Sequence, residues 1–238
     1  MFDTSGSFES GTQLAWSRES RPGSLAEVLQ GFEPRRRLLK PKSHLFRAGQ
    51  PAGSMYLVNS GVFKTSLASC DGRERITGFR LRGDLVGMES LGQELHACGA
   101  VALATGEVWE YTRQQLAAAG PAAQMRLADE LAGEIRRDWR WMLDTSSLCA
   151  EKRVVAFLLD LGDRQQAMGF SGRLLSLHMT RSEIGNFLAL QLETVVRALS
   201  KLQQLGLVGI DGREIELRDR AALARLVALP AASRLRAA

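Results

Sequence analysis

Four side chains between positions 193 and 200 are of the types that bind the edges of DNA bases. Glu193, Val196, Arg197 and Ser200 lie three or four positions apart, so a helix presents them on one face. A guanidinium can bind a guanine edge through two hydrogen bonds, a carboxylate can accept one from cytosine N4, and an apolar group can touch a thymine methyl. We interpret Glu193, Val196 and Arg197 as base-reading residues. The alternative is an ordinary packed helix pair that carries a solvated Glu–Arg pair.

The stretch that must position these side chains, residues 179–203, is typical of two helices joined by a tight turn. Thr180 is a good N-cap, and Glu183 three residues later completes a capping box. A break at 189–191 precedes a second helix that begins near Leu192. Both helices have an apolar face at helical spacing, formed by Ile184, Phe187, Leu188, Leu192, Val195, Leu199 and Leu202.

The segment after the second helix predicts a small β-hairpin. Gly206 fits the end of a helix. Two short alternating runs, 207–210 and 213–217, flank Asp211-Gly212, which is a strong hairpin signal. A helix-turn-helix closed by a hairpin is a winged helix, and chance produces this whole package far less often than a helix pair.

Length and composition restrict the class of protein. The 238 residues suffice for two compact domains, and 45% hydrophobic with 24% charged residues is typical of a soluble globular protein. The net charge of +5 and a pI near 9.5 fit an anionic partner. No apolar run approaches the ~20 residues of a membrane span, and the N-terminus has no signal-peptide pattern. We therefore expect a cytoplasmic protein that has no membrane partner.

Glycines recur along residues 38–112 and separate short apolar or alternating segments. This texture predicts an antiparallel sandwich or barrel, here a β-roll of the jelly-roll kind. The basic run at 35–37 is interpreted as solvated surface, without a role. The expected strands are 55–58, 62–67, 75–79, 85–88, 101–104 and 107–111.

A long helix without internal proline is predicted at about 121–146, with Pro121 in its first turn. Its seam of three- and four-residue spacing consists of Ala128, Leu131, Ile135, Asp138 and Met142. We expect this seam to pair with a second copy, since helix-turn-helix proteins usually read two half-sites as symmetric dimers. The alternative is that the seam packs on the β-domain. Asp138 would bring like charges together, and we hypothesise that it tunes dimerisation.

These patterns predict an α+β fold divided into five parts. Helices at 150–161 and 219–228 are expected to flank the helix-turn-helix, and Ser24 is expected to cap a short helix at 25–32. The parts are a flexible N-terminus at 1–23, the β-roll at 24–120, the dimerisation helix at 121–146, the winged helix-turn-helix domain at 147–228 and a tail at 229–238.

This order of elements resembles the family of the cyclic-AMP receptor protein and the fumarate–nitrate regulator, which are bacterial transcription factors. The segments ITGFRLRGDLVGMESLG (76–92), GEIRRD (133–138) and MTRSEIGNFLALQLETVVR (179–197) look closest to its fumarate–nitrate branch. The resemblance covers nearly all of residues 25–228. It implies a cyclic-nucleotide-binding-like sensory β-roll and a homodimeric, sequence-specific DNA-binding regulator that is no enzyme and has RNA polymerase as a partner.

The iron–sulfur chemistry of the fumarate–nitrate branch is not matched. Its oxygen sensor uses cysteines near the N-terminus and one in the β-roll. Residues 1–40 contain no cysteine here, and the matching β-roll position is Trp109. A cluster needs about four thiolates, whereas the chain has only Cys70, Cys98 and Cys149. We predict no iron–sulfur cluster.

The cyclic-AMP branch is also poorly matched. It holds the cyclic phosphate with a Gly-Glu pair and with an Arg-Ser pair further along the chain. The corresponding segment has Gly83-Asp84, but the stretch 92–97 contains no arginine, the residue that offers two fixed donors to a phosphate. We therefore predict that cyclic AMP is not the signal.

The resemblance assigns roles within the recognition helix. Glu193 and Arg197 match the residues with which both branches read a GA-containing core, in half-sites written TTGAT or TGTGA. Val196 stands where the fumarate–nitrate branch has Ser, and Leu192 where the cyclic-AMP branch has Arg. The candidate phosphate contacts, which position the helix without reading sequence, are Thr180, Arg181 and Lys201.

Three alternatives stay open at this point. A metal-dependent jelly-roll enzyme needs clustered ligands, yet His44 and His96 are the only histidines of the β-region and no His-x-His occurs. A cyclic-nucleotide-responsive regulator lacks the phosphate arginine. A haem or nitric-oxide sensor could use His44, His96 or a cysteine as an axial ligand. No cofactor is predicted, and the sequence does not identify the signal.

Overall fold

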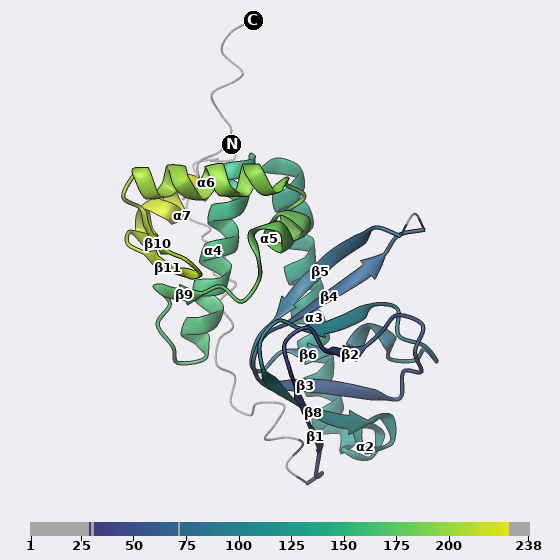
Figure 1. Cartoon of the computed structure of the whole chain (residues 1–238). Coiled ribbons are helices and arrows are strands. Elements are labelled where there is room, and N and C mark those ends of the chain that lie inside the picture. The colour runs from purple at the N-terminus through teal and green to yellow at the C-terminus, as the bar shows by residue number, and fades with distance from the viewer. Residues whose placement is uncertain (1–28, 30, 71, 229–238) are drawn as a thin grey trace, which may run out of the picture.

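The computed structural model describes residue 29, residues 31–70 and residues 72–228. Figure 1 shows a β-roll and a mostly helical C-terminal module (residues 150–228), which are connected by one long helix, α3 (Gly120–Ser147). This arrangement confirms the α+β fold class with β-roll, long helix and winged helix-turn-helix in that order. No helix among the described residues is long and apolar enough to cross a membrane.

Two four-stranded antiparallel sheets form the β-roll, with strand orders β1-β8-β3-β6 and β2-β7-β4-β5. Residues of both sheets, among them Phe46, Phe63, Ala100 and Val108, share one buried cluster. The strands are β1 (Arg35–Leu39), β2 (His44–Phe46), β3 (Ser54–Ser60), β4 (Phe63–Ala68), β5 (Glu74–Arg80), β6 (Leu85–Val86), β7 (Gly99–Ala102) and β8 (Gly106–Thr112).

The β-roll differs from the prediction at its two ends. The basic run at 35–37 is not merely solvated surface, because it begins β1, which pairs with β8. Its arginine side chains lie over the neighbouring strands: Arg36 covers the Trp109 ring, and Arg37 is 3.8 Å from Glu110. The helix α2 (Arg113–Ala118), which is capped by Thr112, was likewise not predicted from the sequence.

The predicted strand at 85–88 is too long. β6 ends at Val86, because Gly87 has a φ of 90° and turns the chain into the 3-10 helix η1 (Met88–Ser90). The predicted helix at 25–32 falls mostly on residues that are not described, as do the N-terminus at 1–23 and the tail at 229–238. Leu29 is described and is buried against the β-roll in a cluster with Met55 and Tyr111.

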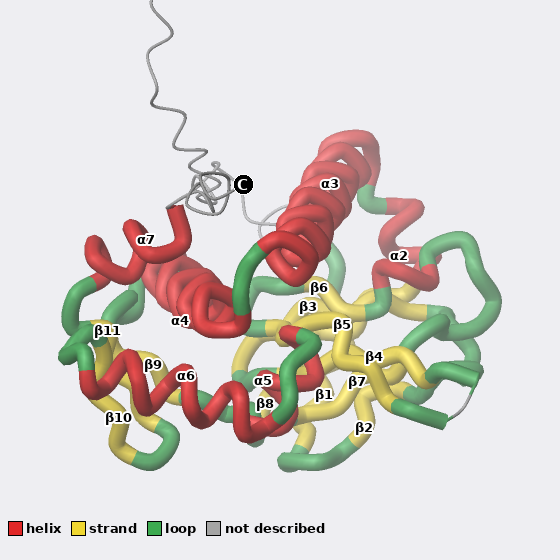
Figure 2. The backbone as a smooth tube through the Cα atoms, turned by 90° about the horizontal axis from the view of Figure 1, so that it is seen from above, coloured by secondary structure: helices red, strands yellow, loops and turns green. Residues whose placement is uncertain are grey.

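The C-terminal module combines four helices with a three-stranded sheet of order β10-β11-β9. Figure 2 shows α4 between α6 on one side and α7 on the other. Its elements are α4 (Ala150–Ala167), β9 (Leu174–Ser176), α5 (Arg181–Leu188), α6 (Leu192–Gln204), β10 (Val208–Asp211), β11 (Glu214–Leu217) and α7 (Arg220–Ala228).

Helix α4 is longer than the predicted 150–161. Gly162 lets the helix continue beneath the loop that precedes β9, since a Cβ at this position would lie 2.6 Å from the Gly172 carbonyl oxygen. Val154, Val155 and Leu158 of this helix are buried.

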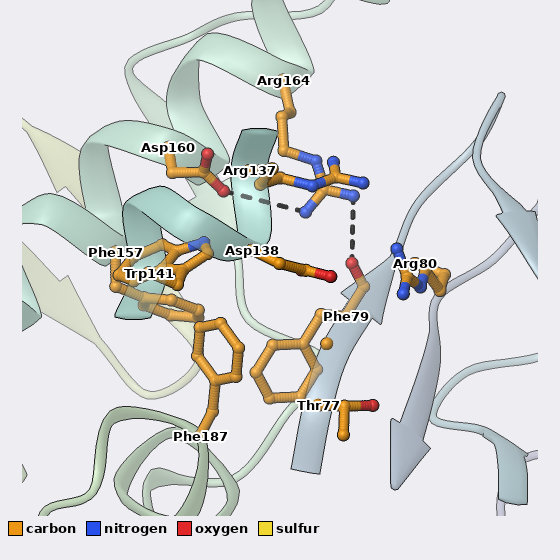
Figure 3. A pocket seen from close by; sticks show the side chains of 11 residues that line it. Thr77, Phe79, Arg80, Arg137, Asp138, Trp141, Phe157, Asp160, Arg164 and Phe187 are labelled. Carbon is orange, nitrogen blue, oxygen red and sulfur yellow. Dashed lines mark hydrogen bonds and ion pairs between the residues drawn. The ribbon is translucent and has the colours of Figure 1, made fainter. Parts of the chain in front are cut away.

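The β-roll, α3 and the C-terminal module meet in one junction, which is drawn in Figure 3. Its apolar part is a cluster of Phe79, Trp141, Phe157 and Phe187, with ring centroids 5.0 Å apart for Trp141 and Phe187. Its polar part is a network of carboxylates and guanidiniums around a cavity of about 20 Å³. Three separate segments of the chain are therefore packed together at a single point.

The polar part of the junction centres on Asp84, which is 3% exposed. Its carboxylate binds the Arg164 guanidinium of α4, lies 3.9 Å from Arg137 of α3, and accepts a 2.7 Å hydrogen bond from the backbone N–H of Leu81. Arg80 of β5 forms a further ion pair with Glu134 of α3. Charges of opposite sign thus connect the β-roll to both helices.

Candidate nucleic-acid interface

Helix α5 begins at the predicted capping box. The Thr180 hydroxyl accepts a hydrogen bond from the backbone N–H of Glu183 at 3.1 Å, and the Glu183 carboxylate accepts one from the backbone N–H of Thr180 at 2.8 Å. Burial acts to raise the pKa of Glu183, but hydrogen bonds from Thr180 and Lys64 outweigh burial and hold this pKa below its usual range. The carboxylate therefore stays ionised and keeps both contacts.

The turn between α5 and α6 depends on close backbone approach. Ala189 takes a left-handed conformation with a φ of 56°, and the backbone N–H of Leu190 donates to the Gly185 carbonyl oxygen at 2.8 Å. A Cβ at Gly185 would lie 2.6 Å from the Leu190 carbonyl oxygen. Only glycine allows the turn to pack this tightly on the first helix.

Substitution of this glycine is expected to damage the interface. Gly185→Ala should lower the free energy of unfolding by about 1–3 kcal/mol, because the added methyl pushes the two helices apart. Gly133→Ala, a helix-interior change whose Cβ would meet only an Arg136 side-chain atom at 3.8 Å, should instead raise it by about 1 kcal/mol. Chemical denaturation measures both. Equal effects of the two variants would contradict the role of Gly185.

Helix α6 presents the three predicted base-reading residues to solvent. Glu193, Val196 and Arg197 are exposed, with Val196 at 45%, whereas Val195 and Leu199 on the opposite side are buried in the module core. On this face an Arg197 guanidinium nitrogen lies 3.5 Å from the Thr194 hydroxyl. A helix that packs on one side and offers a carboxylate, a methyl surface and a guanidinium on the other can enter a major groove.

The wing follows α6 as predicted. Gly206 has a φ of 70°, and the backbone N–H of Leu207 donates to the Leu202 carbonyl oxygen at 3.0 Å, which closes the helix end. β10 and β11 form an antiparallel hairpin with Gly212 in the turn, at a φ of 55°. The sequence reading lacks β9, which pairs with β11 as a third strand. The sequence Leu174-Leu175-Ser176 gives only a faint signal, because the strand has three residues and its alternation appears in their burial and not in their types.

The predicted phosphate contacts lie at the start of α5 and in α6, and each already has a partner within the chain. The Thr180 hydroxyl is used in the capping box. The Arg181 guanidinium donates to the Gly212 carbonyl oxygen at 3.1 Å and so connects the start of α5 to the wing turn. The Lys201 ammonium is 2.6 Å from a Glu151 carboxylate oxygen, and this hydrogen bond raises the pKa of Lys201. Their contacts with phosphate stay predictions.

Helix α3 carries the predicted dimer seam, but the structure divides it between two faces. Leu131 packs against the β-roll cluster of its own chain. Asp138 lines the junction cavity, where burial raises its pKa against the attraction of Arg80 and Arg137. Leu131 therefore packs on the β-domain, as the alternative expected, whereas Asp138 borders the cavity at an exposed position.

The exposed apolar side chains of α3 follow a neighbouring line. Met125, Trp139 and Met142 are 68%, 63% and 67% exposed, and Ile135 lies between them. Together with two alanines, these side chains form a line in which the spacing alternates between three and four residues, as in a coiled-coil seam. The line consists of Met125, Ala128, Ala132, Ile135, Trp139 and Met142.

A β-roll, a long helix and a winged helix-turn-helix with an exposed polar recognition face define a class of DNA-binding transcription regulators. Comparison with protein families supports both halves. Residues 36–119 match the cyclic nucleotide-binding domain, and residues 152–226 match the Crp-like helix-turn-helix domain.

Known relatives cover most of the chain. The fumarate and nitrate reduction regulatory protein of Escherichia coli is 36% identical over 203 residues, which are 84% of this chain and 81% of that protein. The transcriptional activator protein Anr of Pseudomonas aeruginosa is 38% identical over 199 residues, 82% of this chain and 80% of that protein. The solved structure of FixK2 from Bradyrhizobium japonicum has 32% identity and a TM-score of 0.76, with 84% of this chain and all of that chain covered. The chain belongs to the CRP/FNR family of transcription regulators.

The family's cyclic nucleotide does not fit the residues of this β-roll. The loop that follows β6, residues 87–98, contains Glu89 and Glu94 but no lysine or arginine that could bind a phosphate. Inside the roll, His96 is 3% exposed and stacks on Phe46, with ring centroids 3.7 Å apart. The Arg113 guanidinium donates to the Ser90 carbonyl oxygen at 2.8 Å, so it closes the loop from outside. The loop therefore offers a phosphate no cationic side chain, and its one histidine is held in a stack inside the roll.

The cysteines of the described residues are poorly suited to a metal cluster. Burial, reinforced by the nearby Glu89 carboxylate, raises the pKa of Cys98 to about 12. The thiolate is the form that binds metal, so this thiol is a weak ligand. Cys70 and Cys149 are exposed and free. In the part of the chain that is described, no three histidine, cysteine or carboxylate side chains gather in a group that could hold a metal ion.

Proposed function

We propose that this regulator binds, as a homodimer, a palindromic DNA site with a GA core in each half-site, of the TTGAT or TGTGA kind. The observation that carries the proposal is the exposed set of Glu193, Val196 and Arg197 on α6, backed by a buried face and closed by a wing. These side chains have the donors, acceptors and methyl surface that distinguish base pairs in the major groove. The relatives named above as regulators support the same reading.

The proposal is tested by DNA binding. The purified protein is titrated against a TTGAT palindrome, a TGTGA palindrome and a duplex with the GA core of each half-site replaced, at one fixed salt concentration. We expect the core replacement to weaken binding by about 1–3 kcal/mol for each base pair that is read. Equal affinity for all three duplexes would contradict sequence-specific binding.

The homodimer is proposed to form through the exposed α3 seam (Met125, Ala128, Ala132, Ile135, Trp139 and Met142). An apolar stripe of this length on a long helix is covered when a second copy pairs with it. Asp138 lies beside this seam, so its proposed tuning of the dimer acts together with Arg80 and Arg137 rather than on the two-fold axis.

Introduction of a charge into the seam is expected to separate the protomers. Trp139→Glu should weaken the dimer at least about a hundredfold, because two carboxylates would be buried without partners. Arg140→Ala, at an exposed position next to the seam, serves as the matched control and should leave the dissociation constant nearly unchanged. Sedimentation equilibrium measures both, and circular dichroism checks the fold. A Trp139→Glu protein that dimerises like the Arg140→Ala control would refute this interface.

For the sensory domain we propose that neither a cyclic nucleotide nor an iron–sulfur cluster is the signal. The stack of Phe46 and His96, the acidic loop and the protonated Cys98 thiol support this proposal. A haem would require His96 to leave its stack, or the exposed His44 to act alone. An absorption spectrum of the purified protein should lack a Soret band and a cluster shoulder. RNA polymerase is the further proposed partner, and the cytoplasm is the proposed location.

A further inference from the structure

One side chain of the helix-turn-helix binds the backbone of the β-roll. The Oδ1 atom of Asn186, in α5, accepts a hydrogen bond from the backbone N–H of Ile76 at 2.7 Å. Its Nδ2 atom donates to the backbone carbonyl oxygen of Glu74 at 2.8 Å. These residues are 110 and 112 positions apart in the sequence. The contact therefore joins the β-roll to the helix-turn-helix beside a hydrophobic cluster that both modules share.

The strand that Asn186 binds is an edge strand. β5 is the last member of the order β2-β7-β4-β5, so one side of its backbone has no neighbouring strand. An edge presents alternating N–H and C=O groups that need partners. The Asn carboxamide offers an acceptor and a donor on two separate atoms at once, as a neighbouring strand would. Asn186 thus caps the edge with one bidentate contact.

Neighbouring contacts reinforce this attachment without duplicating it. The Lys64 ammonium of β4 lies 3.1 Å from Glu183, and the Arg75 guanidinium of β5 donates to the Phe187 carbonyl oxygen at 3.3 Å. The Phe187 ring packs edge-on against Phe79 at 5.5 Å. All of these contacts fall on α5. The β4–β5 hairpin therefore holds the first helix of the pair, and Figure 1 shows α5 between this hairpin and α6. The recognition face of α6 stays exposed.

We propose that Asn186 is a positioning residue that fixes the recognition helix relative to α3 and so sets the spacing between the two half-sites. α5 and α6 pack as one unit through the tight turn at Gly185, so an α5 that is fixed on β5 fixes α6 as well. In a dimer formed along α3, the orientation of each module determines the distance between the two recognition helices, normally one helical turn of DNA. The inference rests on the proposed homodimeric DNA binding.

The first test needs no DNA. Amide hydrogen exchange is measured for the β5 backbone in the wild type, N186A, N186D and N59A. Loss of two hydrogen bonds in N186A should speed exchange of the Ile76 amide roughly tenfold or more. N186D keeps an acceptor and should protect that amide. N59A removes a 2.9 Å hydrogen bond between Asn59 and Glu107 inside the β-roll and should leave Ile76 unchanged. Unchanged Ile76 exchange in N186A would overturn the proposal.

The second test measures half-site spacing. Palindromes with the spacer that the wild type binds best, and with that spacer lengthened by two base pairs, are compared with a single half-site. The ratio of the affinities for the two spacers should be roughly tenfold smaller in N186A than in the wild type, while the affinity for the single half-site stays unchanged. Undiminished discrimination, or an equal loss on the single half-site, would overturn the positioning role. A wild type that binds no palindrome would refute the proposed function, and the exchange result would still decide whether Asn186 fixes the module.

Discussion

Replacement of Arg197 by alanine is expected to remove about 2–6 kcal/mol of binding free energy on a palindromic site. Each bidentate contact between a guanidinium and a guanine edge is worth about 1–3 kcal/mol, and a dimer makes this contact twice. The structure favours a large effect because the Arg197 side chain is exposed on α6 and its hydrogen bond to Thr194 is long, at 3.5 Å. The Arg197 guanidinium therefore loses little interaction energy within the protein when it binds DNA.

The matched control for Arg197 is Lys201→Ala on the same helix. A phosphate contact carries no sequence information, so this variant should weaken all duplexes alike and reduce the salt dependence of binding. Binding isotherms on the specific palindrome and on random DNA, at three salt concentrations, separate the two behaviours. An Arg197→Ala protein that loses the same affinity on both duplexes would exclude a base-reading role.

Removal of the Asp84 carboxylate is expected to be the most destabilising single change. Asp84→Ala should lower the free energy of unfolding by about 3–5 kcal/mol, because it leaves buried cations without their counter-charge. Arg164 and Arg137 both approach this carboxylate, and the Leu81 N–H also loses its acceptor. Burial lowers the pKa of Arg164 although Asp84 acts to raise it, which marks how much this guanidinium depends on its partner.

Two further variants serve as controls for the Asp84 prediction. Asp84→Asn keeps an acceptor for the Leu81 N–H and should be less destabilised than Asp84→Ala. Glu216→Ala breaks an exposed ion pair with Arg218 at 3.1 Å, and such pairs contribute about 0–1 kcal/mol. Urea denaturation measures all three. If Asp84→Ala unfolds at the same urea concentration as Glu216→Ala, the junction does not stabilise the fold as described.

Local signals predicted the winged helix-turn-helix well. The capping box at Thr180 and Glu183, the helix end at Gly206 and the turn at Gly212 each act within about six residues. The interactions that form these features involve only neighbouring residues, so the sequence predicted the bounds of the helices and of the hairpin closely. The exposed face of α6 followed from the same helical period.

Contacts between distant segments could not be predicted in this way. In the sequence, Asn186 is an ordinary polar residue of a helix, and only the folded chain shows that the edge of β5 lies beside it. In the sequence, Asp84 is an ordinary acidic residue next to a glycine, and nothing near it indicates that its ionic partners lie on α3 and α4. The α3 spacing fits two adjacent lines for a related reason, and only the folded chain shows that the β-roll cluster takes up Leu131 while Met125, Trp139 and Met142 stay exposed.

The Glu183 carboxylate takes part in two structures at once. One of its oxygens caps α5, beside the proposed phosphate contacts Thr180 and Arg181, and the other binds Lys64 on the β-roll at 3.1 Å. Docking of the module and the proposed DNA binding therefore share a group, and any free energy that couples them must be equal in both directions. On that proposal, a change that loosens the β4–β5 hairpin is expected to weaken DNA binding, and bound DNA is expected to stabilise the hairpin by the same amount.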